Sequence, residues 1–150
     1  MSYLPREMPF PHPSPEDETY WQGCRERKLV IRHCNTCDTY SHPPMPSCPF
    51  CGSMDLGWRR VTGEGKIFSY TIAHHPVHAA LKGHTPYNIV VVMLDGADDV
   101  RLVSNVVNAS PEEIRIGAAV ELYWDEIEDG QFLPRFSLKA SNESNKKEAS

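Results

Sequence analysis

The chain has 150 residues, of which 40% are hydrophobic and 23% are charged, and its formal net charge is −5. This size suits one domain, or a small module joined to a modest one. The acidic balance argues against a broad phosphate-binding surface, because such a surface needs clustered Lys and Arg. No apolar run approaches the roughly 18 residues that span a bilayer, and the N-terminus lacks the apolar segment of a secretory signal. We therefore expect a cytoplasmic protein.

Residues 1–28 are expected to form an extended leader followed by a short helix. Five prolines between Pro5 and Pro15 exclude a helix or a central strand from the leader, because proline fixes φ and removes a backbone donor. The leader is then either a frayed terminus or a segment laid along a partner surface. Ser14 suits the N-cap of the helix, and Pro15 suits its first position.

Tyr20, Trp21 and Cys24 stand at helical spacings and predict one apolar face on this helix. That face packs either on the chain's own following segment or on a partner. Aromatic side chains are common interface anchors, so Tyr20 and Trp21 are candidate partner-facing residues. A nucleophilic cysteine needs a lowered pKa and a positioned base, but Cys24 lies on the apolar face of the helix, so we expect it to be a small buried hydrophobe.

Residues 29–57 carry two Cys-x-x-Cys pairs with ten residues between them, namely Cys34, Cys37, Cys48 and Cys51. Four thiolates on two tight turns can meet tetrahedrally around one zinc ion. A catalytic zinc usually keeps an open position and three protein ligands, so four ligands predict a structural metal. Iron in a rubredoxin-like site is the alternative, because four thiolates suit both metals. The pattern is typical of a zinc ribbon entered by a short strand at Leu29–Ile31.

Residues 58–140 change to the period of strands and predict a small antiparallel barrel. The expected strands are residues 66–73, 87–94, 100–107, 120–125 and 132–138. A short helical turn begins near Pro111, and Asp129-Gly130 predicts a hairpin turn. The fold class is therefore mainly β, with an N-terminal helix, a rubredoxin-like ribbon and a five-stranded OB-type barrel; an SH3-like barrel is the main alternative. The polar residues 141–150 are expected to be disordered.

Alternation in the first barrel strand places Phe68, Tyr70 and Ile72 on one face, which the barrel core would use. Tyr87 and Trp124 are expected to belong mostly to the core as well.

Two polar clusters are candidates for other roles. A loop after the first barrel strand carries His74, His75, His78, Lys82 and His84. These residues could meet an anionic ligand or a partner's active-site mouth, although a solvated loop is favoured. A second group, Asp125, Glu126, Glu128 and Asp129, flanks the hairpin turn and is expected to be solvated. The sequence predicts no catalytic residue.

These motifs together resemble the zinc-ribbon/OB-fold acyl-CoA-associated proteins, a family long catalogued as a domain of unknown function. The resemblance covers residues 14–140 and rests on the two cysteine knuckles (34–37 and 48–53), the strand 65–71 and the strand entry Gly117–Val120. It implies an accessory subunit that binds thiolase-fold proteins or hydratases acting on acyl-CoA substrates. The partner would supply the catalytic residues, as in acyltransferases or in aldolases that shorten steroid side chains by a retro-aldol step.

The competing hypothesis is a nucleic-acid-binding protein, since zinc ribbons and OB barrels both occur in that class. It needs a basic groove with exposed stacking aromatics, which the charge balance disfavours. An enzyme that uses the histidine loop is a third and weaker possibility.

Overall fold

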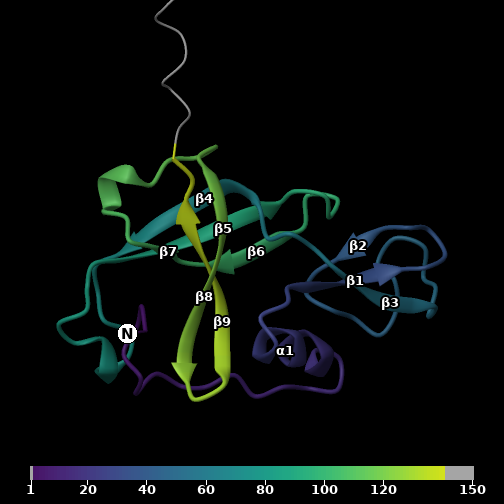
Figure 1. Cartoon of the computed structure of the whole chain (residues 1–150), viewed down its shortest axis with the longest axis horizontal. Helices are drawn as coiled ribbons and strands as arrows, with labels where there is room; N and C mark the ends of the chain where they lie inside the picture. Colours follow the sequence, from purple (N-terminus) through teal and green to yellow (C-terminus); the bar gives the residue numbers. More distant parts are fainter. Residues whose placement is uncertain (1, 141–150) are drawn as a thin grey trace, which may run out of the picture.

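The computed structural model describes residues 2–140. Its elements are α1 (Glu18–Arg25), β1 (Val30–Cys34), β2 (Tyr40–Ser41), β3 (Leu56–Arg60), β4 (Gly65–Ala73), η1 (Ala79–Leu81), β5 (Tyr87–Leu94), β6 (Arg101–Ser104), β7 (Val106–Val107), η2 (Pro111–Glu113), β8 (Ala119–Glu128) and β9 (Gln131–Leu138). Figure 1 shows β1, β2 and β3 at one end, the other strands at the opposite end, and α1 near their junction.

The smaller sheet has the antiparallel order β2-β1-β3. β1 pairs along its whole length with β3, from Val30 opposite Arg60 to Cys34 opposite Leu56. The strand expected before the first knuckle is confirmed, and it runs directly into the first cysteine. The pairing therefore fixes one metal-binding turn at the end of a sheet strand.

The larger sheet has the order β6-β5-β4-β8-β9-β7, and it confirms the OB-type barrel rather than the SH3-like alternative. Neighbouring strands are antiparallel except β7, which runs parallel to β9 through Val106 opposite Phe136. The hairpin turn predicted at Asp129-Gly130 joins β8 to β9, with Gly130 at a φ of 71°. Inward-facing Val90, Val92 and Phe136 are fully buried in the core.

The expected third strand, residues 100–107, is divided by Asn105 into β6 and the two-residue β7. Asn105 is buried, and its side chain donates to the Asn88 carbonyl instead of continuing a regular strand. The sequence pattern did not reveal this break, because Leu102-Val103 before it and Val106-Val107 after it both have the composition of a strand.

The expected inward face of β4 is wrong. Ile67 is buried, whereas Phe68 and Tyr70 are 43% and 39% exposed. A bulge interrupts the ladder with β5 between Ile67 and Ser69. The extra residue of a bulge re-aims the side chains that follow it, so simple alternation fails at this position. Tyr87 and Trp124, also assigned to the core, are half-buried.

α1 is shorter than expected and begins at Glu18, although the Ser14 carbonyl already accepts from the Glu18 amide at 2.9 Å. Tyr20 and Cys24 join one hydrophobic core with Leu29 and Ile31 of the smaller sheet and with the inner residues of the barrel. The helix thus packs on its own chain, one of the two arrangements left open by the sequence. None of the helices in residues 2–140 has the length and apolar character needed to cross a membrane.

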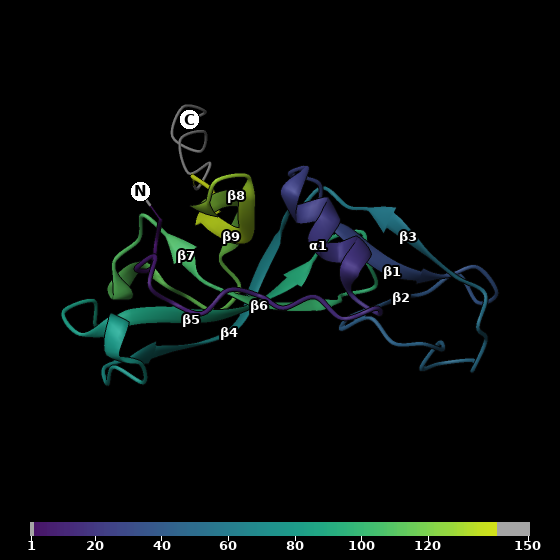
Figure 2. The same ribbon diagram turned by 90° about the horizontal axis from the view of Figure 1, so that it is seen from below.

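Residues 2–5 of the leader are half-buried and not frayed, and their contact with a partner stays a prediction. The backbone of the leader lies against the barrel, and the Tyr3 hydroxyl accepts a 2.9 Å hydrogen bond from the Asn88 side chain. Figure 2 shows this purple segment passing β5 and β6 on its way to α1. The prolines keep the segment extended, which allows it to follow the barrel surface. The tail expected to be disordered, residues 141–150, lies outside the described residues.

Candidate metal centre and partner-facing residues

The two cysteine knuckles have the same backbone geometry. The Cys34 amide donates to the Thr39 carbonyl at 2.8 Å, and the Cys48 amide donates to the Ser53 carbonyl at 2.8 Å. The fifth position of each turn is in the left-handed region, with φ of 57° at Asp38 and 76° at Gly52. Asp and Gly tolerate this conformation better than most residues, so the local sequence supports both turns.

The four cysteine Sγ atoms all lie within 4.8 Å of one another. Cys34 Sγ is 3.7 Å from Cys51 Sγ, and Cys37 Sγ is 3.6 Å from Cys48 Sγ. A tetrahedral zinc with Zn–S bonds of about 2.3 Å has S···S edges of about 3.8 Å. These two edges match zinc, and since all four sulfurs lie within 4.8 Å of one another the cluster can close around the ion with small side-chain shifts; its four sulfur ligands then fill the coordination shell.

Backbone amides in the knuckles favour the thiolate form of the ligands. Amides of Cys37 and Thr36 lower the pKa of Cys34, and amides of Cys51 and Phe50 lower the pKa of Cys48 to about 6. Thiolate is the form that binds metal, so the turns prepare Cys34 and Cys48 for an ion as well as positioning them. At Cys51 the Ser53 amide lowers the pKa, but desolvation and the neighbouring cysteine side chains outweigh it and raise the pKa to about 12.

Polar contacts around the first knuckle hold it in place. His33 is buried beside Cys34, and its Nε2 lies 2.9 Å from the Asp38 carboxylate. Asn35 donates through its side chain to Asp55 at 3.0 Å, which joins the knuckle to the segment entering β3. Sequence reasoning missed His33; its position directly before a metal ligand was the only available signal.

The aromatic pair on α1 is split between two environments. Tyr20 is only 5% exposed, and its ring packs edge-on against Trp21 at a centroid distance of 5.1 Å. Trp21 is half-buried, and its indole Nε1 donates to Asp17 at 3.0 Å. Burial raises the pKa of Cys24 to about 12, in keeping with an inert thiol. Of the pair, Trp21 is thus the one with accessible surface.

The histidine loop is exposed, and its side chains do not assemble a metal site. His74, His75, His78, Lys82 and His84 are all exposed. His78 accepts from the Ala80 amide at 3.2 Å and thereby caps η1. Within residues 2–140, the four cysteines form the one group of three or more metal-binding side chains close enough to share an ion. A role for the loop in meeting a ligand or a partner stays a prediction.

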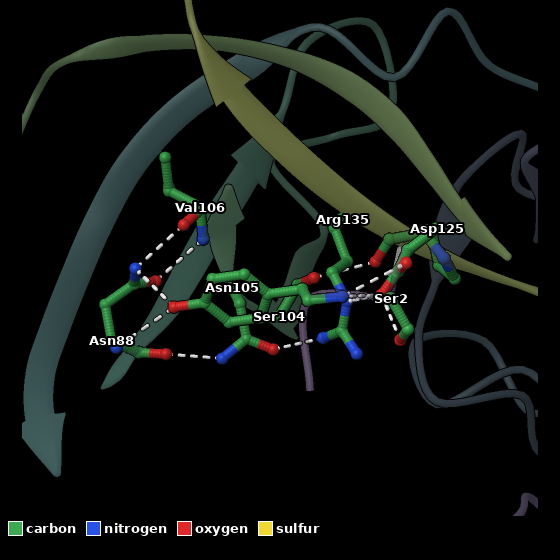
Figure 3. A network of polar contacts seen from close by, with 9 residues as sticks. Ser2, Asn88, Ser104, Asn105, Val106, Asp125 and Arg135 are labelled. Atoms are coloured by element: carbon green, nitrogen blue, oxygen red, sulfur yellow. Dashed lines mark hydrogen bonds and ion pairs between the residues drawn. The ribbon is translucent and has the colours of Figure 1, made fainter. Parts of the chain in front are cut away.

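A buried polar network in the barrel was not foreseen (Figure 3). Asp125, expected in a solvated cluster, is 2% exposed and forms a 2.5 Å ion pair with buried Arg135. The expectation was wrong because β8 extends to Glu128 and the leader covers Asp125. Glu126, Glu128 and Asp129 are exposed, as expected.

The network joins segments that are distant in the sequence. Arg135 also donates to Asn105, whose side chain donates to the Asn88 carbonyl. The Asn88 side chain in turn bonds both backbone groups of Val106, at 2.7 and 2.8 Å. Asp125 accepts from the Ser2 hydroxyl and the Tyr3 amide at 3.2 and 3.1 Å. These contacts fasten the leader to the barrel. They also connect β6 and β9, which are not hydrogen-bonded neighbours in the sheet.

Two protein-family models match adjacent parts of the chain. Residues 21–57 match "ChsH2, rubredoxin-like zinc ribbon domain", and residues 58–125 match "ChsH2, C-terminal OB-fold domain". Together with the sulfur geometry, the first match identifies the four cysteines as a structural zinc site.

Known proteins show the same likeness. A solved structure titled "Ltp2-ChsH2(DUF35) aldolase" has a chain 37% identical to this one, with a TM-score of 0.77, covering 86% of this chain and 98% of that chain. A "DUF35 domain-containing scaffold protein" of Pyrococcus furiosus is 30% identical, over 80% of this chain and 89% of its own length. A "Probable enoyl-CoA hydratase alpha subunit" of Thermomonospora curvata is 40% identical over 80% of this chain, but the match spans only 37% of that longer protein.

Proposed function

Because the chain belongs to the DUF35 family, we propose that it is a non-catalytic accessory subunit that binds and stabilises a thiolase-fold partner acting on acyl-CoA substrates. The partner supplies the catalytic residues for a retro-aldol or acyl-transfer step, as in a steroid side-chain aldolase. The observation that carries the proposal is the structural similarity to one chain of the aldolase whose name joins Ltp2 and ChsH2.

The metal centre supports a scaffold role. Four protein sulfurs complete the zinc shell, whereas a catalytic zinc keeps a position for water or substrate. The zinc therefore fixes the shape of the ribbon. The buried contacts between Asp125 and Arg135 fix the barrel in a similar way, and both features produce a rigid surface for another subunit.

A hydratase partner is the second candidate. The Thermomonospora curvata relative carries this module within a longer chain named as a hydratase alpha subunit. In that arrangement the module would serve a hydratase, and the acyl-CoA chemistry would still lie outside it.

The test is co-expression with defined partners. The tagged chain is produced with Ltp2 of the similar aldolase, with a thiolase-fold protein, and with an enoyl-CoA hydratase. We expect stable co-elution with a thiolase-fold subunit on size-exclusion chromatography. We also expect retro-aldol cleavage of a β-hydroxyacyl-CoA thioester, into a carbonyl compound and a smaller acyl-CoA, only when both subunits are present.

The matched control is the Cys48→Ser variant, which removes one zinc ligand. It should lose the partner together with the metal if the ribbon shapes the binding surface. Failure of the wild-type chain to associate with Ltp2 or with the thiolase-fold protein would overturn the proposal. Association with the hydratase alone would favour the second candidate.

A further inference from the structure

One face of the barrel sheet is formed by β4, β5 and β6 and points away from the core. Cross-strand partners share a face of a sheet, so the registers define it. Met93 pairs with Arg101 in β6 and with Lys66 in β4, and Val91 pairs with Val103 and with Ser69. We call this surface the outer sheet face; its main members are Phe68, Ile89, Val91, Met93, Arg101 and Val103.

The outer sheet face is apolar and accessible, in contrast to the inward side of the same strands. Val103 is 68% exposed and Phe68 is 43% exposed, whereas Val90 and Val92 on the inward side are fully buried. Phe68 follows buried Ile67, has no partner in the ladder with β5, and lies beneath the Arg101 guanidinium, whose Cζ is 3.9 Å from the ring centroid. A contiguous exposed apolar surface commonly marks an interaction site.

A groove continues this surface toward the leader and the helix. It has a volume of about 300 Å³, and its walls include Leu4, Trp21, Ile89, Val103 and Leu133. The leader, α1, β5, β6 and β9 therefore each contribute an apolar side chain to one concavity. A groove of this kind can hold a single large apolar side chain, as the anchor pockets of protein interfaces do.

The charged residues of β4, β5 and β6 indicate what kind of partner surface would complement the outer sheet face. β4 contains Lys66 and β6 contains Arg101, while none of the three strands contains Asp or Glu. The whole chain, by contrast, has 20 acidic and 15 basic residues. The outer sheet face thus carries two cations opposite Met93, beside the exposed carboxylates of Asp98 and Asp99 in the loop that joins β5 to β6. These two cations complement carboxylates at the edge of an apolar patch on a partner.

We propose that the outer sheet face is the docking surface for the thiolase-fold subunit, through an apolar patch edged by carboxylates. One large apolar side chain of that subunit enters the groove beside Trp21, and its carboxylates meet Lys66 and Arg101. This inference rests on the proposed function. A single nucleic-acid strand would need more than two cations along the strands, so the charges favour the protein partner.

The experiment measures the affinity of surface variants for the purified thiolase-fold subunit. Val103→Asp places a charge in the centre of the face on an exposed side chain, and we expect about a hundredfold weaker binding because a central interface position loses its apolar contact. Arg101→Glu should weaken binding by about tenfold and remove most of the salt dependence of association. Ile116→Asp is the matched control, because Ile116 is 69% exposed in the segment before β8. It should bind within about twofold of the wild-type chain.

Zinc content and thermal unfolding show that each variant is folded. Met54→Asp tests the ribbon tip, where Met54 is 80% exposed, as the rival surface. If the wild-type chain binds but Val103→Asp binds equally well, or Met54→Asp alone abolishes binding, this inference fails while the proposed function stands. If the wild-type chain does not bind the subunit, the proposed function fails. Salt-sensitive binding of single-stranded DNA that Arg101→Glu abolishes would assign the face to nucleic acid instead and overturn the inference.

Discussion

The polar contacts within the ribbon and those within the barrel differ in how far apart in the sequence their partners lie. In the first knuckle, the hydrogen bond between His33 and Asp38 spans five residues. In the barrel, the contact of Ser2 with Asp125 spans 123 residues, and that of Asn105 with Arg135 spans 30. The cysteine knuckles are therefore specified by short sequence motifs and a metal, whereas the barrel's polar network exists only after distant segments have met.

Because of this difference, mutations in the ribbon and mutations in the barrel should destabilise the protein in different ways. Loss of a zinc ligand should affect the ribbon first, because few apolar side chains hold its tip. Loss of a network residue should affect the whole barrel and the leader, because each member touches several segments. The predictions below test this contrast.

The largest effect is expected from the metal site. Cys48→Ser should abolish zinc binding and unfold the ribbon tip, because structural zinc sites contribute about 10–16 kcal/mol of apparent binding free energy at neutral pH. Amide hydrogen exchange should show loss of protection in β1 and β3, with protection retained in the β8–β9 ladder. Equal loss of protection at both ends would contradict the contrast.

Cys24 provides the matched control for the metal site. It is the fifth cysteine, and it lies outside the four-sulfur cluster. Cys24→Ala should keep about one zinc per chain by metal analysis, as expected for a single four-cysteine site. In the wild-type protein, burial raises the pKa of the Cys24 thiol to about 12, so Cys24 should resist alkylation at pH 8 while the protein is folded.

The next largest effect is expected from the buried ion pair. Arg135→Met leaves the Asp125 carboxylate buried without its cation, and this should lower the free energy of unfolding by about 3–5 kcal/mol. The double variant Asp125→Leu with Arg135→Met should recover most of that loss, because both charges are then gone. Urea unfolding of both proteins measures the difference.

The exposed pair of Lys28 and Glu26 is the control for the ion pair. Its N···O distance is 2.8 Å, but both side chains are nearly half exposed. Lys28→Met should leave the free energy of unfolding within the error of the same measurement, since water screens exposed pairs. A large effect here, with none at Arg135, would show that burial does not decide the contribution of these pairs.

The zinc site and the barrel class were predictable because their signals are periodic or closely spaced. The Cys-x-x-Cys pairs identify the ligands directly, and alternating apolar residues identify most strands. The burial of Asp125 was not predictable, because it depends on Ser2 and Tyr3 reaching a residue far along the chain. The outward position of Phe68 was missed because a bulge changes the period locally.

A smaller effect with a diagnostic sign is expected at Gly23 in α1. Helix propensity alone predicts that Gly23→Ala stabilises the protein by about 1 kcal/mol. A Cβ there would lie 2.7 Å from the Lys28 carbonyl, so we expect destabilisation by about 1–3 kcal/mol. Gly57→Ala in β3 is the control, because its Cβ would meet ordinary contacts at 3.5 Å. It should be neutral or stabilising in the same urea titration, so a stabilising Gly23→Ala would show that the helix end is free to adjust.

The smallest effect tests whether the leader is fastened or only rests on the barrel. Tyr3→Phe removes the hydroxyl that accepts from the Asn88 side chain, while Asn88 keeps its bonds to Val106. Burial raises the pKa of Tyr3, so the hydroxyl is neutral at pH 7, and its loss should cost about 1 kcal/mol. Tyr123→Phe, at a side chain that is 40% exposed, is the control and should have no effect. Faster hydrogen exchange in β5 of Tyr3→Phe, without change in β1, would show that the leader contributes to the barrel and not to the ribbon; equal exchange in both proteins would mean that the leader is not held by this contact.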